Sequence, residues 1–272
     1  MSEPRESSAG ATVATGNLLE VSDLRVSFGA KRHRTVAVDG VSLHVAPEET
    51  LAVVGESGSG KTTVARCVVG LQKPDSGTVT FEGQPLGPVG RRPPERQRAI
   101  QMVFQDPRSS LNLRMTVAQL IGEAWRTHPA AAPPGDRDAA LRGVLADVGL
   151  DADVAERTAG DLSGGQCQRV SIARALAVGP RLLVCDEAVS ALDVSVQAQI
   201  LRLLVELRRS HHLALLFISH DLGVVHQIAD RVAVMRNGAV VEEGPASDVL
   251  GAPRHEYTQA LLDAALDLGV DE

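Results

Sequence analysis

Short apolar runs, each closed by a polar or glycine-rich turn, recur along this chain. They predict strands at residues 18–28, 51–54, 78–81, 100–104, 181–185 and 213–218. Runs without polar alternation, such as 51–54, are typical of parallel strands that are buried on both faces. Residues 36–45 predict a further pair of strands around an Asp39-Gly40 turn, and residues 231–235 and 239–243 predict a hairpin across Asn237-Gly238.

Apolar residues at helical spacing predict helices at 115–125, at 138–148 and from about 164 to 178. A loop rich in proline and alanine separates the first two at 129–135. A longer amphipathic helix is predicted at 194–210, and shorter helices at 63–69, at 222–229 and, as a pair, over 247–268. Residues 91–98 are polar and interrupted by proline, so no element is predicted there. The pattern therefore predicts an α/β chain in which a helical block interrupts a sheet-based core.

A glycine-rich stretch joins the predicted strand 51–54 to the predicted helix 63–69. It consists of Gly55, Glu56, Ser57, Gly58, Ser59, Gly60, Lys61 and Thr62. Strand, glycine-rich loop and helix are the context of a phosphate-binding P-loop. Glycines let successive backbone N–H groups turn toward an anion, and the helix N-terminus adds its positive dipole end. We therefore expect Lys61 to reach the β- and γ-phosphates of a nucleoside triphosphate, and the Thr62 hydroxyl to ligate Mg²⁺.

Composition narrows the class of protein. The 272 residues carry a net charge of −7, which does not suggest a general nucleic-acid-binding surface. Aromatic residues make up only 2%, which favours an α/β core of Leu, Val, Ile and Ala. The three cysteines have no metal-ligand spacing, and Cys67 and Cys185 lie in apolar segments typical of buried thiols. No apolar run is long enough to cross a bilayer, and residues 1–16 lack the apolar region of a secretory signal. We expect a cytoplasmic chain with a disordered lead-in at 1–16, and any role at a membrane then requires a partner that supplies the span.

Further candidate residues lie where predicted strands end. Strand 181–185 is followed by Asp186, placed to hold Mg²⁺ through water, and by Glu187, placed to polarise an attacking water as general base. Gln105 and His220 follow the strands 100–104 and 213–218. A lone histidine is more often structural, but the strand-end position of His220 favours a catalytic role.

A second glycine-rich turn opens the helix predicted from about 164. It contains Ser163, Gly164, Gly165 and Gln166. A second anion site is unexpected in a protein with one nucleotide unless two chains share each nucleotide. Phe28 leaves two interpretations open, a core residue or a platform on which adenine stacks, and the basic turn 29–35 is interpreted as a solvated hairpin tip.

Taken in order, these motifs resemble those of ABC-type ATPases, the nucleotide-binding subunits of ABC transporters. The matching residues are 55–62, Gln105, 162–166, 182–187, Ser190-Ala191-Leu192-Asp193 and His220, and the resemblance runs from about residue 18 to 266. The stretches 101–112, 186–197 and 253–262 resemble the oligopeptide, dipeptide and nickel importer branch in particular. The resemblance implies a P-loop NTPase fold, in which a RecA-like core carries an antiparallel β subdomain and an inserted helical subdomain at about 107–178 with the signature motif. The ATPase domain then spans 17–250, and 251–272 form a C-terminal tail of the peptide-importer type.

The same resemblance implies a mechanism in which two ATPase subunits, identical or related, pair head to tail. ATP and Mg²⁺ are bound by the loop of one subunit, from Gly55 to Thr62 and on to Thr63, with Thr62, Gln105 and Asp186 at the metal. The Ser163–Gln166 turn of the other subunit faces the γ-phosphate. Phe28 then matches the adenine-stacking position, Asp193 couples the two sites, and His220 holds Glu187 and the attacking water in place.

The implied partners are two integral membrane permease subunits, a second ATPase subunit and, indirectly, an extracytoplasmic solute-binding protein, with no nucleic acid. The chain is expected to act at the cytoplasmic face of the membrane on di- or oligopeptides. Nickel or another small solute is the alternative cargo. A soluble ABC ATPase of DNA repair or translation is disfavoured, because the chain has one set of motifs and no heptad run.

Four positions depart from the branch: Glu48, Leu113, Cys167 and Glu256. Glu256 replaces a usual proline, which puts a rigid turn there in doubt, and Leu113 alters a surface expected to face the membrane partner. Cys167 stands where arginine is common, and a buried or half-buried thiol near the dimer interface is expected to make the ATPase sensitive to oxidation.

Overall fold

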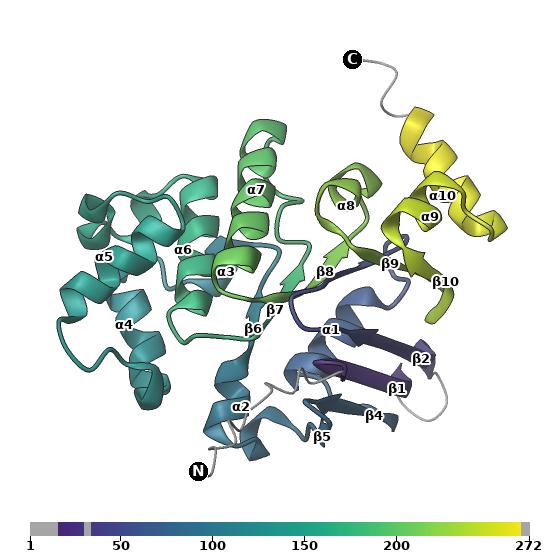
Figure 1. The fold of residues 1–272 in the computed structure, drawn as a ribbon, viewed down its shortest axis with the longest axis horizontal. Helices are drawn as coiled ribbons and strands as arrows, with labels where there is room; N and C mark the ends of the chain where they lie inside the picture. Colours follow the sequence, from purple (N-terminus) through teal and green to yellow (C-terminus); the bar gives the residue numbers. More distant parts are fainter. Residues whose placement is uncertain (1–15, 30–33, 268–272) are drawn as a thin grey trace, which may run out of the picture.

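The computed structural model describes residues 16–29 and 34–267 (Figure 1). The lead-in expected at 1–16 lies outside the described residues except for Gly16, as do residues 30–33 of the basic turn. None of the helices in the described ranges is both long and apolar enough to cross a membrane.

A six-stranded sheet forms the centre of the molecule, with the strand order β10-β9-β3-β8-β7-β6. Its members are β3 (Thr50–Val54), β6 (Ile100–Val103), β7 (Leu182–Asp186), β8 (Ala214–Ser219), β9 (Arg231–Arg236) and β10 (Ala239–Pro245). All neighbours are parallel except the β9–β10 hairpin. Every residue of β3, β7 and β8 is buried, as the continuous apolar runs predict.

A smaller antiparallel sheet has the order β2-β1-β4-β5. It consists of β1 (Leu19–Phe28), β2 (Thr35–Val45), β4 (Ser76–Phe81) and β5 (Gln84–Pro85). The strand pair predicted around Asp39-Gly40 is wrong, because β2 runs through both residues as one strand. Gly40 takes a φ of +72° where the β1–β2 register is irregular, and the Asp39 carboxylate pairs with Arg25 of β1. The Asp-Gly pair thus makes an irregularity inside a strand and not a turn.

The helical block lies beyond the β6 edge of the large sheet (Figure 1). It contains α3 (Pro107–Ser110), α4 (Val117–Thr127), α5 (Arg137–Asp147) and α6 (Gly164–Leu176), with short 3₁₀ turns at Pro129–Ala131, Ala152–Glu156 and Ala159–Asp161. Thr116 and Gln119 form a capping box that starts α4, and Trp125 of α4 donates its indole N–H to the Ala177 carbonyl at 2.9 Å. Leu120, Ile121 and Leu145 are fully buried, so the block packs around a core of its own that continues into the central sheet.

The remaining helices cover the two faces of the large sheet. They are α1 (Lys61–Val69), α2 (Pro94–Ala99), α7 (Val194–Ser210), α8 (Leu222–Ile228), α9 (Ala246–Gly251) and α10 (Glu256–Asp267), with a 3₁₀ turn at Val89–Arg91. Alternate strand residues face opposite layers: Leu51 and Val53 of β3 pack with α1 and the small sheet, whereas Ala52 and Val54 pack with α8 to α10. The α/β class with an antiparallel second sheet is therefore confirmed, while α2, α3 and β5 are elements that the pattern does not predict. Glu48 sits in the turn before β3 with a φ of +59°, and Glu256 opens α10.

Candidate active site

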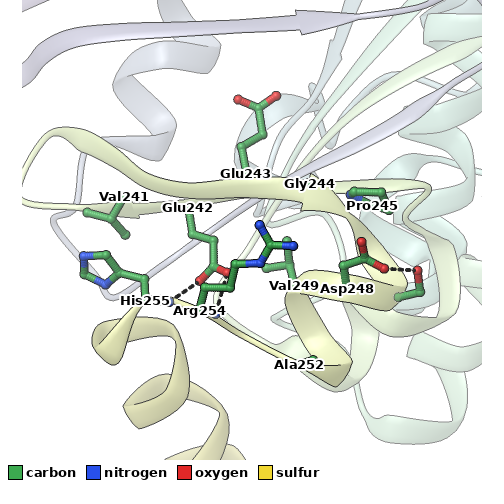
Figure 2. A pocket seen from close by; sticks show the side chains of 11 residues that line it. Val241, Glu242, Glu243, Gly244, Pro245, Asp248, Val249, Ala252, Arg254 and His255 are labelled. Carbon is green, nitrogen blue, oxygen red and sulfur yellow. Dashed lines mark hydrogen bonds between the residues drawn. The ribbon is translucent and has the colours of Figure 1, made fainter.

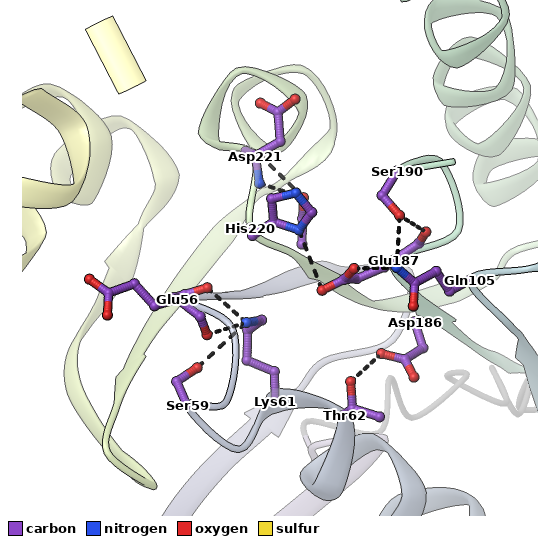
Figure 3. A network of polar contacts seen from close by, with 12 residues as sticks. Glu56, Ser59, Lys61, Thr62, Gln105, Asp186, Glu187, Ser190, His220 and Asp221 are labelled. Atoms are coloured by element: carbon purple, nitrogen blue, oxygen red, sulfur yellow. Dashed lines mark hydrogen bonds and ion pairs between the residues drawn. The ribbon is translucent and has the colours of Figure 1, made fainter. Parts of the chain in front are cut away.

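Four adjacent parallel strands deliver the predicted site residues to one edge of the large sheet. In the order β3-β8-β7-β6, the chain continues into Lys61 after β3, His220 after β8, Glu187 after β7 and Gln105 after β6. The carboxyl ends of parallel strands meet at one edge, where α/β proteins bind ligands. Figure 3 shows these side chains converging from separate loops.

The loop after β3 is shaped by backbone that approaches too closely for side chains. A Cβ added to Gly55 lies 2.1 Å from the Met235 carbonyl oxygen, and one added to Gly60 lies 2.3 Å from that of Ala37. Gly55, Gly58 and Gly60 have φ values of +146°, +82° and +105°. Gly60 is the N-cap of α1, and no side chain caps that helix. The first N–H groups of α1 are therefore open to an anion, as the motif predicts.

Lys61 lies folded back over this loop. Its ammonium donates to the carbonyl oxygens of Gly55 at 2.7 Å and Glu56 at 2.8 Å, and lies 3.5 Å from the Ser59 hydroxyl. The side chain is 4% exposed, and burial lowers the pKa of its ammonium, opposed by the nearby carboxylates of Glu187, Asp186 and Glu56. The charge therefore lies in a partly desolvated position that favours a negatively charged ligand.

Thr62 and Asp186 form the second contact of the site. The Thr62 hydroxyl donates to the Asp186 carboxylate at 2.9 Å. Burial raises the pKa of Asp186, while the Thr62 hydrogen bond acts in the opposite direction. In the part of the chain that the structure describes, no cluster of three or more His, Cys, Asp or Glu side chains could hold a metal ion alone. The Thr62 hydroxyl and the Asp186 carboxylate suit Mg²⁺, which takes one or two protein oxygens, several waters and the phosphates of its substrate.

Glu187 is held between two side chains. Gln105 donates its side-chain N–H to the Glu187 carboxylate at 2.8 Å, and His220 Nδ1 lies 3.4 Å from the other carboxylate oxygen. The backbone of Glu187 has a φ of +49°, which is unusual for a residue with a side chain. Its N–H donates to the Ile218 carbonyl at 3.0 Å, and the Ser190 hydroxyl donates to its carbonyl at 3.0 Å. Fixed backbone and flanking partners thus orient this carboxylate.

The second glycine-rich turn lies in the helical block. Ser163 is the N-cap of α6 and forms a capping box with Gln166. A Cβ on Gly165 lies 2.6 Å from Val196 of α7, whose N-cap, Asp193, accepts from the Val196 N–H at 2.9 Å. Among the residues the structure describes, no hydrogen bond or ion pair joins this turn to the loop at 55–62. The contact between Gly165 and Val196 therefore brings Ser163, Gly165 and Asp193 together where α6 and α7 begin.

The structure also shows the surroundings of Phe28, Cys167 and Tyr257. Phe28 is 45% exposed, so its interpretation as a core residue is wrong, and the adenine platform stays a prediction. Cys167 is fully buried, and burial raises the pKa of its thiol, which disfavours reaction with an oxidant; the sensitivity to oxidation stays a prediction. Sequence reasoning gave no role to Tyr257, whose hydroxyl accepts the Glu56 N–H at 3.2 Å. Two signals were available for it: it is the single tyrosine of the chain, and it lies in the stretch 253–262 that resembles the importer branch.

Comparison with known proteins places these features in context. Residues 38–190 match the family described as "ABC transporter". The oligopeptide transport ATP-binding protein OppF of Salmonella typhimurium is 46% identical in an alignment 260 residues long that covers 91% of this chain and 77% of that protein. AmiF of Streptococcus pneumoniae, an oligopeptide transport ATP-binding protein, is 42% identical over 91% of this chain and 81% of its own.

Solved structures are similar too. A dimeric ATP-binding cassette, MJ0796 bound to ADP and phosphate, superposes with a TM-score of 0.73 at 25% identity, over 84% of this chain and 98% of its own. The cbiO1 component of the Clostridium perfringens cbiONQ transporter complex gives 0.72 at 26% identity, over 87% and 91%.

Proposed function

The chain belongs to the ABC transporter family, and from this premise we propose that it is the ATP-hydrolysing subunit of an importer for oligopeptides or dipeptides. One observation carries the enzymatic part. The Glu187 carboxylate is held between Gln105 and His220 at the sheet edge that also carries Lys61. The peptide cargo is proposed from relatives named for oligopeptide transport.

The residues divide the reaction between them. The N–H groups of the loop at 55–62 and of Thr63 take the phosphates of ATP, and the Lys61 ammonium balances their charge. Thr62, Asp186 and Gln105 would hold Mg²⁺, which when bound would neutralise charge on the phosphates. Glu187 orients a water for attack on the γ-phosphorus and accepts its proton, while the bond from the γ-phosphorus to the bridging oxygen breaks and ADP leaves; His220 keeps the carboxylate in position.

A second ATPase subunit completes the site. Ser163, Gly165 and Asp193 lie on one surface of this chain, and the neighbouring Val194 is 82% exposed. Pairing two subunits head to tail brings this surface against the loop of the partner, and Val194 is then covered. Phe28, at the end of β1, supplies the stacking surface for adenine.

We further propose that two integral membrane subunits dock on the groove between the core and the helical block, and that the chain acts at the cytoplasmic face of the membrane. This groove, of about 340 Å³, is lined from both sides, by Val69, Leu71, Val89, Met102 and Phe104 and by Ala124, His128 and Arg174 among others. Leu71 and Val89 are 58% and 39% exposed, which is unusual for apolar side chains and supports a protein partner. Gln105 directly follows Phe104, so a residue that lines the docking groove and a residue that contacts Glu187 lie in the same loop. An extracytoplasmic binding protein delivers the peptide.

The test of hydrolysis uses Glu187→Gln against a matched control, Glu206→Gln, on an exposed position of α7. The purified chain is expected to hydrolyse ATP, Glu187→Gln to lose roughly a hundredfold or more of kcat, and Glu206→Gln to retain it. Unchanged turnover in Glu187→Gln would show that the general base has been assigned wrongly.

Transport is tested by capture from detergent-solubilised membranes, using Glu187→Gln with Mg-ATP to hold the closed dimer. Polytopic membrane proteins are expected to co-purify, and Leu71→Asp should reduce their recovery without changing ATP binding. Recovery of soluble proteins or nucleic acid alone would overturn the importer assignment.

A further inference from the structure

The C-terminal tail reaches back to the phosphate-binding loop through one side chain. The Tyr257 hydroxyl accepts a hydrogen bond from the backbone N–H of Glu56 at 3.2 Å, across 201 positions of sequence. The ring is buried, with 6% exposure, in the cluster that contains Ala52 and Val54 of β3. The Arg236 guanidinium lies 4.6 Å from the ring centroid. The tyrosine is therefore packed on the strand that leads into the loop and bonded to the loop itself.

The segment that leads into α10 is hydrogen-bonded to the large sheet just before Tyr257. The Glu242 carboxylate on β10 accepts the backbone N–H groups of Arg254 at 2.8 Å and of His255 at 3.1 Å, as Figure 2 shows. His255 Nδ1 in turn accepts the Tyr257 N–H at 3.1 Å. These bonds hold the tail against the sheet immediately before Tyr257. They therefore fix the position of the Tyr257 hydroxyl.

The atom that Tyr257 contacts belongs to a peptide unit with a second task. The Glu56 N–H and the Gly55 carbonyl are the two polar ends of one planar peptide group and point in opposite directions. The Gly55 carbonyl accepts the Lys61 ammonium at 2.7 Å. The hydroxyl of Tyr257 thus holds one end of the peptide group whose other end receives Lys61. Gly55 has no side chain to resist rotation of this group, so the orientation depends on its bonding partners.

We propose that Tyr257 is a positioning residue for the ATP site: it sets the orientation of the Gly55–Glu56 peptide and thereby presents Lys61 for the phosphates. The tail is then a working part of the nucleotide site and not a separate appendage. This proposal rests on the ATP site proposed above. A loop that is already oriented binds its ligand without first having to order itself, so the effect falls on ATP affinity.

The test separates the hydroxyl from the ring. Tyr257→Phe keeps the buried ring and its contact with Arg236 and removes only the acceptor. Gln259→Leu is the matched control, because it deletes another hydrogen bond at the start of α10, from the side-chain amide to the Pro253 carbonyl at 2.9 Å, that does not reach the loop. Steady-state ATP hydrolysis and the hydrogen exchange rate of the Glu56 amide are measured on the full chain.

We expect Tyr257→Phe to raise KM for ATP about fivefold, the contribution of one hydrogen bond, with kcat within twofold of the parent chain. The Glu56 amide should exchange faster, and Gln259→Leu should change neither quantity. A Tyr257→Phe chain that unfolds more readily but keeps its KM and its Glu56 exchange rate would reduce the tyrosine to a packing residue and overturn the proposal. If the parent chain itself does not hydrolyse ATP, the proposed function fails, and this inference fails with it.

Discussion

Replacing Asp186 by asparagine is expected to stabilise the fold while removing activity. The carboxylate is 6% exposed at the end of β7, and burial raises its pKa above the ordinary value of 3.8. The charged form is thus less favourable in the folded chain than in the unfolded one. The contribution of Asp186 to stability is full below the unfolded pKa and declines as pH rises through the folded pKa. Each unit of difference between the two pKa values removes about 1.4 kcal/mol of unfolding free energy at neutral pH.

Asparagine has no charge to desolvate, and its side-chain oxygen still accepts the Thr62 hydrogen bond. We therefore expect Asp186→Asn to raise the free energy of unfolding at pH 7 by about 1 kcal/mol, in the range typical of relieving strain at a functional site. For a chain of this size this is a shift in Tm of roughly 2 °C. The gain should shrink as pH falls and vanish below the unfolded pKa, where the wild-type carboxyl is protonated in both states.

Asp193→Asn is expected to change the stability of the chain in the opposite direction. The Val196 N–H and the Ser195 hydroxyl bond to this exposed carboxylate at the start of α7 and lower its pKa. Its stabilising contribution is present above the unfolded pKa and is lost as pH falls through the folded one. Asp193→Asn should therefore destabilise the chain at pH 7, and this loss should disappear at low pH.

The assay is urea denaturation of the nucleotide-free chain at a series of pH values between about 3 and 8, so that the series passes below the unfolded pKa of both carboxyls, with ATPase activity measured at neutral pH. Asp186→Asn should lose roughly a hundredfold of activity as it gains stability. The reasoning would be refuted if Asp186→Asn were the less stable chain at pH 7, or if its advantage grew as pH fell.

Three other substitution or labelling tests follow from the packing. Gly165→Ala places a Cβ 2.6 Å from Val196, whereas Gly164→Ala meets its nearest neighbour at 3.7 Å. Only the first should lower the unfolding free energy in urea titrations, by about 1–3 kcal/mol, and adding Val196→Ala should restore it. Arg92→Met removes the guanidinium that donates to the Val68 carbonyl in the last turn of α1 at 2.9 Å. It should lower the unfolding free energy by about 1–3 kcal/mol in urea titrations. Arg91→Met, at an exposed position, is the neutral control. All three cysteines are buried and burial raises the pKa of each thiol, so a disulfide reagent at pH 8 should label them only when urea unfolds the chain; rapid labelling of the native chain would contradict the packing.

The elements that sequence reasoning places well keep one regular burial pattern along their length, either one buried face of a helix or a continuously buried strand. The amphipathic pattern predicts residues 194–210 as a helix, and α7 has those bounds. The buried strands β3, β7 and β8 follow for the same reason. The turn predicted at Asp39-Gly40 is wrong because an Asp-Gly pair occurs both in hairpin turns and in irregularities inside strands. Which of the two forms depends on the partner strand, here on Arg25 of β1, which pairs with Asp39. The sequence pattern does not predict α2, because proline, which interrupts a helix from within, also starts one.

In the candidate site too, some features can be predicted from the sequence and others cannot. Motif order is enough to predict that Gln105, Glu187 and His220 follow neighbouring strands, since a parallel sheet brings strand ends together. The positive φ of Glu187 and the contact between Tyr257 and Glu56 depend on packing between segments that are far apart in the chain, and no local pattern records them. The two interpretations of Phe28 could be separated only by its exposure, which the strands around it determine.

The electrostatics of the site also indicate why a nucleotide would bind there tightly. Burial shifts Lys61 and Asp186 in opposite directions, each toward its neutral form, so both charges are held at the expense of folding free energy. A triphosphate beside Lys61 and a divalent cation beside Asp186 would each favour the charged form again. Part of the binding free energy then comes from relieving penalties that the folded chain already bears, and removing either penalty by substitution should stabilise the protein while weakening its ligand. On this reasoning the raised stability and lost activity expected of Asp186→Asn have a single cause.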